Sequence, residues 1–156
     1  MLGPTRVTGF YQAAALRSPG LTSAPAIARW LAHQVIAPQH GLREKAGFNP
    51  IRKGIPHPAE LSGEEWEAMI EEDPRWGRVV CFCNRVTEGE VMEAVRRGAR
   101  TLDGVKFRTR AGFGRCQGGF CTDRILQILA RELGVEPEEV PLRDPSSPLV
   151  MGKVRP

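Results

Sequence analysis

Four cysteines most restrict how this chain can fold, because all of them fall between positions 81 and 121 of its 156 residues. They form two short motifs, C-x-C at Cys81 and Cys83, and C-x4-C at Cys116 and Cys121. A cysteine can serve as a small buried apolar residue, but the glycines and arginines beside these motifs are poor neighbours for a core. Disulfides are uncommon in a reducing cytoplasm. The pattern therefore favours a metal site with four thiolate ligands.

The spacing of the motifs says less about which metal is bound. Zinc sites with four cysteines usually use C-x2-C knuckles, so C-x-C is too short and C-x4-C is too long for that pattern. The spacing also differs from the runs of plant-type and bacterial ferredoxins. From spacing alone, a four-thiolate site is strongly indicated and an iron–sulfur cluster only moderately.

Residues around the cysteines favour the iron–sulfur alternative on electrostatic grounds. A two-iron cluster with four thiolates is doubly negative when oxidised, and it needs hydrogen-bond donors and positive potential. Each motif lies just before a predicted helix start, where free N–H groups are available. Glycines let further backbone N–H groups approach the cluster without an intervening Cβ. The residues expected to surround the cluster beyond its ligands are Gly112, Gly114, Arg115, Gly118 and Gly119.

Prolines, glycines and apolar residues divide the chain into four segments. Residues 1–38 are expected to form a short buried strand in GFYQAAAL, an SPG turn and a helix that Pro38 stops. Residues 39–76 are typical of a linker with one short helix at SGEEWEAMIEE. Residues 77–140 hold every cysteine, and the proline-rich residues 141–156 are expected to run extended over the surface.

The cysteine-containing segment is predicted to be a small helical domain. GRVVCFC is expected to enter it as an extended strand, and TEGE forms a capping box for a helix over 88–98. A second helix is expected from Thr101 to near Gly112, and a third follows the glycine loop and stops at Gly134. The predicted fold class is mainly α: a helix-loop-helix, a glycine loop and a helix, preceded by a strand-turn-helix segment.

Composition and charge exclude several classes. No apolar run approaches the roughly 18 residues that a membrane helix needs. The apolar N-terminal stretch is broken by Thr8, Gly9 and Gln12, so it does not fit a secretion signal. We therefore expect a cytoplasmic protein that reaches a membrane only through partners.

A basic run is the main support for a different class of function. Between Ala94 and Arg115, seven basic residues face a single acid, Asp103. The run fits a solvated helix face, compensation for a nearby negative charge, or a zinc-stabilised module that binds nucleic acid. The only aromatic residues among these basic residues are Phe107 and Phe113, and no finger spacing is present, so no nucleic acid is expected. An iron- or redox-sensing regulator is a further alternative.

The stretch CFCNRVTEGEVMEAVRRGARTLDGVKFRTRAGFGRCQGGFC closely resembles a known family. It is similar to the bacterioferritin-associated-ferredoxin-like [2Fe-2S] domain. More specifically, it resembles the version of this domain at the C-terminus of the large subunit of anaerobic glycerol-3-phosphate dehydrogenase and of related FAD-dependent oxidoreductases. The match is dense over residues 80–134. The resemblance implies one [2Fe-2S] cluster with the ligands Cys81, Cys83, Cys116 and Cys121.

The resemblance extends upstream of the cysteines. GFYQAAALRSPGLTSAPAIA is similar to the closing segment of that family's flavin domain, and FNPIRKGIP fits the linker that follows. A helix N-terminus there can face the electron-rich edge of a flavin. The implied flavin contacts are Ser18, Gly20, Leu21 and Thr22. Two residues depart from the family pattern: Ala15 replaces an expected glycine, and Arg17 stands where an acid is common.

The chain contains no G-x-G-x-x-G after a strand, so the dinucleotide-binding half of a flavin domain is missing. FAD is therefore expected only through a partner subunit or a missing domain. The resemblance implies an electron-transfer subunit or domain of an FAD-dependent dehydrogenase of the glycerol-3-phosphate or amino-acid and amine type. It would carry electrons from flavin through the cluster to a quinone or carrier protein. No nucleophile–base pair is recognisable, so substrate chemistry is expected elsewhere.

Overall fold

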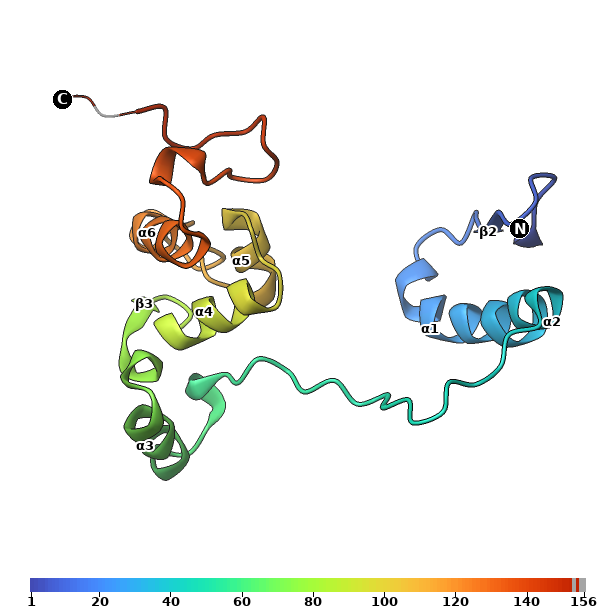
Figure 1. Ribbon diagram of the computed structural model, residues 1–156, viewed down its shortest axis with the longest axis horizontal. Helices are drawn as coiled ribbons and strands as arrows, with labels where there is room; N and C mark the ends of the chain where they lie inside the picture. The colour runs from blue at the N-terminus through green and yellow to red at the C-terminus, as the bar shows by residue number, and fades with distance from the viewer. Residues whose placement is uncertain (153, 155–156) are drawn as a thin grey trace. The chain divides into compact units, whose positions relative to one another are not determined.

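The computed structural model describes residues 1–152 and 154, and the chain divides into two compact units, Met1–Arg52 and Lys53–Pro156 (Figure 1). Each unit is mainly helical and contains one small two-stranded sheet, which confirms the predicted fold class. Within the described residues, no helix has both the length and the apolar character needed to cross a membrane. We call the two parts unit 1 and unit 2.

Unit 1 consists of a hairpin and one long helical stretch. Strands β1 (Leu2–Pro4) and β2 (Tyr11–Ala13) pair antiparallel. After a turn come α1 (Gly20–Trp30), a π-helical stretch η1 (Leu31–Ile36) and α2 (Ala37–His40). The predicted strand is therefore present, but it is not buried, because its only sheet partner is the short strand β1.

The helix of unit 1 continues past Pro38, so the predicted stop at that residue is wrong. The π-helical stretch changes the hydrogen-bond register just before the proline, and the Ala37 N–H donates to the Ala32 carbonyl. A proline is tolerated where the register changes, because its missing N–H leaves fewer groups unpaired there. The helix ends instead at Gly41, which adopts a left-handed conformation.

Unit 2 contains the remaining elements. In chain order they are η2 (Pro58–Glu60), α3 (Gly63–Glu72), η3 (Pro74–Gly77), β3 (Val79–Cys81), β4 (Val86–Thr87), α4 (Glu88–Arg96), α5 (Leu102–Thr109), α6 (Thr122–Leu133) and η4 (Pro137–Glu139). Helices α4, α5 and α6 pack against one another, and Val91, Val105 and Leu129 from these three helices are fully buried between them. This shared apolar core holds the loops that carry the cysteines.

Short sequence motifs correctly predicted the start of α4 and the end of α6. The capping box is present, with the Thr87 hydroxyl accepting from the Glu90 N–H and the Glu90 carboxylate accepting from the Thr87 N–H. Helix α6 ends at Gly134 in a left-handed conformation, as predicted. Helix α5 ends earlier than expected, because Arg110 adopts a left-handed conformation directly after it, two residues before Gly112.

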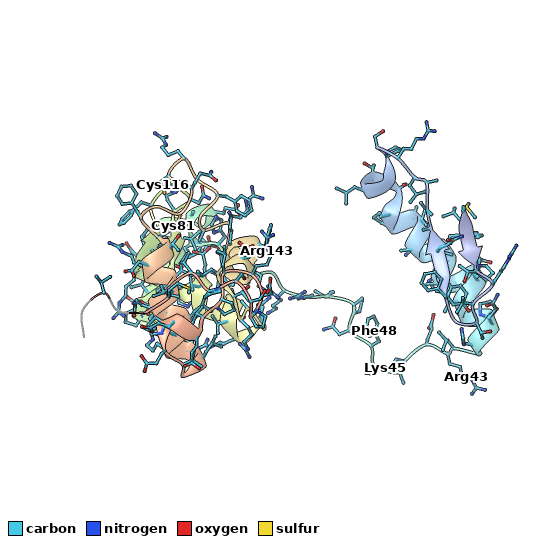
Figure 2. All side chains as sticks on the ribbon, turned by 90° about the horizontal axis from the view of Figure 1, so that it is seen from above. Arg43, Lys45, Phe48, Cys81, Cys116 and Arg143 are labelled. Atoms are coloured by element: carbon cyan, nitrogen blue, oxygen red, sulfur yellow. The ribbon has the colours of Figure 1, made fainter. Side chains whose placement is uncertain are left out.

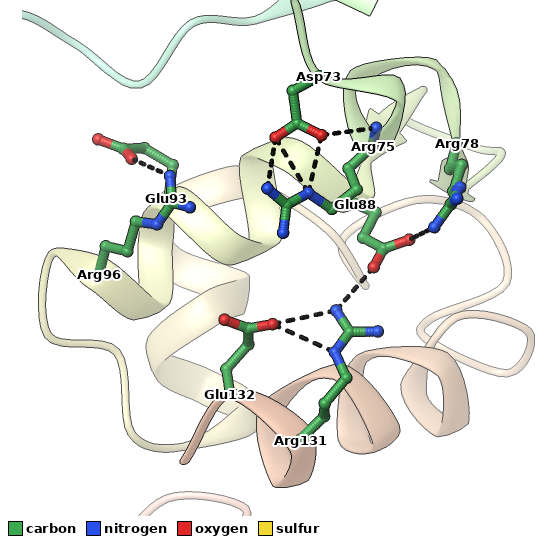
Figure 3. A network of polar contacts seen from close by, with 8 residues as sticks. All are labelled: Asp73, Arg75, Arg78, Glu88, Glu93, Arg96, Arg131 and Glu132. Atoms are coloured by element: carbon green, nitrogen blue, oxygen red, sulfur yellow. Dashed lines mark hydrogen bonds and ion pairs between the residues drawn. The ribbon is translucent and has the colours of Figure 1, made fainter. Parts of the chain in front are cut away.

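Ion pairs join η3, α4 and α6 on one side of unit 2 (Figure 3). The Glu88 carboxylate accepts from Arg131 at 2.7 Å and from Arg78 at 3.4 Å. Asp73 caps η3 through the Arg75 N–H and also pairs with the Arg75 side chain at 2.7 Å. These carboxylates therefore already have cationic partners.

The segment that leads into unit 2 is tied to α4. The Arg97 guanidinium donates to the carbonyls of Lys53 and Gly54, and the His57 ring contacts the buried Glu90 carboxylate at 2.5 Å. At the other end, Leu102 N–H donates to the carbonyl of Pro141, and a turn then brings residues 141 and 148 together. The segment boundaries at 38 and 76 stay predictions.

The close packing of Gly89 against Trp76 gives a test of this core. A Cβ on Gly89 would lie 2.5 Å from the Trp76 ring, so Gly89→Ala is expected to destabilise the protein by about 1–3 kcal/mol through overpacking. Gly63→Ala is the matched control in the first turn of α3, where nothing lies within 4 Å of the added carbon. Urea unfolding of both variants measures the difference. Equal free energies of unfolding would contradict the packing.

Candidate metal centre

Each cysteine lies in or directly beside a turn or loop of unit 2. Cys81 is the last residue of β3, and Cys83 follows it in the turn toward β4. Cys116 lies in the glycine loop after α5, and Cys121 directly precedes α6. Figure 2 shows Cys81 and Cys116 together at one end of unit 2. The hairpin and the glycine loop therefore bring the two motifs to one place.

The thiols pair across the two motifs. The Sγ atoms of Cys83 and Cys116 are 3.6 Å apart, and we call these two residues the outer pair because Cys83 is exposed. Cys81 lies beside Cys121 and contributes to the raised pKa of its thiol, and we call these two the inner pair because each is only 1% exposed. All four are free thiols. One pair thus faces solvent and the other faces the core.

Backbone N–H groups lie near the sulfur of Cys116 in the outer pair. The pKa of the Cys116 thiol is lowered, chiefly by the N–H of Phe120, then by the Cys83 thiol and the N–H of Gly118. These donors stabilise a thiolate. In the inner pair, burial raises the pKa of Cys121 to about 11, and the neighbouring Cys81 adds to the shift. A bound metal would replace the proton that burial otherwise favours.

Two glycines are required by close contacts beside the thiols. A Cβ on Gly114 would lie 2.2 Å from Cβ of Cys83, so a side chain there would push the hairpin away. Gly118 has a φ of +87°, and a Cβ on it would lie 2.6 Å from the Thr122 hydroxyl. Both residues were expected close to the cluster. N–H groups of the glycine loop, chiefly those of Phe120 and Gly118, lower the pKa of the Cys116 thiol, whereas the Gly119 N–H donates to the Cys116 carbonyl at 3.0 Å.

Five further residues were predicted to contact the cluster or a flavin, and they lie in both units. Arg115 lies directly beside Cys116 and makes no ion pair with any residue that the structure describes. Ser18, Gly20, Leu21 and Thr22 lie in unit 1 around the start of α1. Their assignment as flavin contacts stays a prediction.

Two amide side chains that shape the site were not anticipated from the sequence. Asn84 Nδ2 donates to the Arg110 carbonyl at 2.6 Å and so joins the hairpin to the loop after α5. Gln117 Nε2 donates to the Gly114 carbonyl at 3.0 Å and holds the glycine loop closed. In the sequence, their only signal was their position next to Cys83 and Cys116. The Asn84 contact depends on tertiary structure, whereas the Gln117 contact spans only three residues.

The positions of the thiols can be compared with the number and separation of ligands that a metal ion requires. In residues 1–152 and 154, no three or more His, Cys, Asp or Glu side chains are grouped so as to hold a metal ion. Two thiolates on one tetrahedral metal, with bonds of about 2.3 Å, lie about 3.8 Å apart. The outer pair is close to this separation at 3.6 Å. The outer pair therefore has a separation that suits two thiolates on one metal, and Cys81 and Cys116 both lie close enough to Cys121 to raise the pKa of its thiol.

Comparisons with known proteins support this interpretation. Residues 79–131 match the family model of the BFD-like [2Fe-2S] binding domain. The chain is 48% identical over 134 residues to a glycerol 3-phosphate dehydrogenase of Caloramator mitchellensis, covering 85% of this chain and 28% of that protein. It is 38% identical over 89 residues to a subunit of the anaerobic glycerol-3-phosphate dehydrogenase of Escherichia coli K12, covering 52% of this chain and 16% of that protein.

A third relative carries a different name. Hydrogen cyanide synthase subunit HcnB of Pseudomonas aeruginosa is 42% identical over 57 residues, covering 34% of this chain and 12% of that protein. No solved structure matches the chain significantly. The chain thus spans 28% or less of the length of each of these three relatives. The comparisons confirm the resemblance inferred from the sequence: residues 79–131 are similar to the BFD-like [2Fe-2S] binding domain found in dehydrogenase subunits.

Proposed function

We propose that this chain is the electron-transfer part of an FAD-dependent dehydrogenase. Cys81, Cys83, Cys116 and Cys121 would hold one [2Fe-2S] cluster between a flavin and an acceptor. Such a cluster exchanges one electron at a time, whereas a flavin can hold two. The observation that carries the proposal is the pairing of the four thiols across the two motifs, with the Sγ atoms of the outer pair 3.6 Å apart.

The difference in burial between the two thiol pairs fits this role. The inner pair is anchored in the apolar core, which fixes its position. The outer pair lies at the surface, where an electron can leave without crossing protein. Backbone N–H groups from the glycine loop would offset negative charge on the sulfur atoms. Unit 2 thus combines a rigid site with access from outside.

Unit 1 supports an association with a flavin-binding partner or domain. None of the residues of α1 is buried, and Leu21 is 90% exposed in its first turn. A helix with this much apolar surface gains little stability from its own unit. We propose that α1 completes a flavin site in a dehydrogenase subunit or domain, with Ser18, Gly20, Leu21 and Thr22 nearest the flavin. Glycerol 3-phosphate is the first substrate to test, since the Caloramator relative is named for it.

The chain is expected to bind two irons and two sulfides when it is reconstituted without oxygen, because it offers two thiol pairs. It should turn red-brown and give an EPR signal on reduction. Replacing either inner cysteine, Cys81→Ser or Cys121→Ser, should abolish loading, since the core cannot supply another ligand. Iron and sulfide analysis checks this. A colourless protein that binds zinc instead would overturn the proposal.

Gly114→Ala is expected to reduce cluster loading severely without unfolding unit 2. The added carbon would displace Cys83 from Cys116, whereas the helical core lies elsewhere. Gly54→Ala is the matched control, because nothing lies within 4 Å of its added carbon. Iron content and circular dichroism are measured on both variants. Full loading of Gly114→Ala would show that the tight contact with Cys83 is not needed.

A pull-down from native extract tests the flavin partner. The tagged chain is expected to retain a protein that carries FAD, scored by flavin fluorescence after denaturation. Leu21→Asp should lose this FAD, because it puts a charge on the exposed face of α1. Leu42→Asp, at another exposed leucine of unit 1, should retain it. Equal FAD in both variants would exclude α1 from the contact.

A further inference from the structure

The surface around the outer pair has an unusual composition. Three phenylalanines and three arginines border the glycine loop and the hairpin turn, and we call them the rim: Phe82, Phe113, Phe120, Arg110, Arg115 and Arg124. Phe82 lies between the two cysteines of the hairpin, and Phe120 directly precedes Cys121. Phe113 precedes Gly114, which packs against Cys83. All six residues therefore lie on the hairpin turn, on the glycine loop or at the helix ends that border this loop.

The phenylalanines of the rim are exposed although the core of unit 2 is well packed. Phe82 is 65% exposed, Phe113 is 40% exposed and Phe120 is 78% exposed. Single exposed apolar residues are common, but a group of large ones on one face marks an interaction site. Aromatic residues and arginine are also the types enriched in protein interfaces.

Two arginines of the rim contact aromatic rings rather than carboxylates. The Arg124 guanidinium lies 5.4 Å from the centre of the Phe82 ring, and that of Arg110 lies 5.3 Å from the centre of the Phe113 ring. Within the described residues, none of the three rim arginines has a carboxylate within ion-pair distance. Stretch 104–131 contains six basic residues and a single acid, Asp123. The rim is therefore positively charged and largely apolar.

Four arginines elsewhere in unit 2 behave differently from those of the rim. Arg75 pairs with Asp73, which caps η3, and the other three pair with carboxylates of α4: Arg78 and Arg131 with Glu88, and Arg96 with Glu93 (Figure 3). Compensation for a negative cluster would explain positive charge near the thiols, but it would not explain three exposed phenylalanines. A surface that must be both apolar and positively charged fits a protein partner with the opposite charge.

We propose that the rim is the docking surface for a redox protein whose own redox centre is surrounded by carboxylates. This inference rests on the proposed function and names the chemistry of the partner. The phenylalanines would exclude water between the two centres, and the arginines would steer the acidic face into place. Interfaces between redox partners are small and transient. Because this contact would join opposite charges, its affinity should fall strongly as the ionic strength rises.

Nucleic acid is the other polyanion that such a surface could meet. A site for single-stranded nucleic acid needs a basic groove that follows the phosphate backbone, with aromatic rings stacked along it. The rim residues instead border the turn and the loop that carry the outer pair, and Arg96 and Arg97 of the basic run are paired with Glu93. The structure therefore favours a protein partner that binds directly over the outer pair.

The test measures binding to the full, cluster-loaded chain by isothermal titration calorimetry. The probes are plastocyanin, a copper protein with an acidic face, and cytochrome c, a haem protein with a basic face. Plastocyanin is expected to bind, with an affinity that falls about tenfold between low and physiological salt, whereas cytochrome c should not bind. Equal binding of the two probes, or binding of plastocyanin that salt does not change, would overturn the proposal.

Variants locate the contact. Arg110→Gln with Arg124→Gln should weaken plastocyanin binding about five- to tenfold, because two steering charges are removed. Arg96→Gln with Arg143→Gln is the matched control: it makes the same change in net charge at exposed arginines that are already paired with Glu93 and Asp103. Phe120→Ala should also weaken binding, and Phe48→Ala, at an exposed phenylalanine of unit 1, should not. Equal effects of the two arginine pairs would exclude the rim.

Two further readouts separate this inference from the proposed function. Iron and sulfide are measured in every variant, so that loss of the cluster is not mistaken for loss of docking. A chain that never takes up iron contradicts the proposed function, whereas a loaded chain without salt-dependent plastocyanin binding contradicts the docking surface alone. A single-stranded oligonucleotide that binds more tightly than plastocyanin would assign the rim to nucleic acid instead.

Discussion

The close contact between Gly114 and Cys83 is the constraint on which the metal centre depends. The hairpin that carries Cys81 and Cys83 and the loop that carries Cys116 come from distant parts of the chain, and they meet at a point where no side chain larger than hydrogen fits. Asn84 fixes the approach by donating to the Arg110 carbonyl. The helical core therefore serves mainly to hold two loops in register, and the thiol pairing across the motifs follows from that contact.

Burial divides the four thiols into two functional kinds. The inner thiols lie in the core beside apolar side chains, where an unpaired charge would be unfavourable and a metal becomes the natural partner. The outer thiols lie at the surface, within a loop of N–H donors. In the proposed function, this arrangement would hold a cluster from the side of the core and leave it open on the side of the solvent. Stability and access are thus provided by different residues, which lets the rim vary without disturbing the core.

The features that depend on neighbouring residues were predictable from the sequence. The capping box of Thr87 and Glu90 and the left-handed Gly134 were placed correctly, because such signals act within one helical turn. Motif spacing could not show that Cys83 faces Cys116, since this pairing depends on how the hairpin and loop pack. The continuation of the helix past Pro38 was missed for a similar reason: the π-helical register before it leaves no trace in apolar spacing.

The departures of unit 1 from the family pattern have a physical meaning. Ala15 has a φ of +62°, and the left-handed conformation costs an ordinary L-residue roughly 1–2 kcal/mol, which explains why glycine was expected there. Arg17 is also left-handed, with a φ of +53°. Two such residues close together before α1 are strained, and none of the residues of α1 is buried to offset that strain. Unit 2 has a core of its own, whereas the exposed helix α1 of unit 1 supports the proposal that another surface covers it.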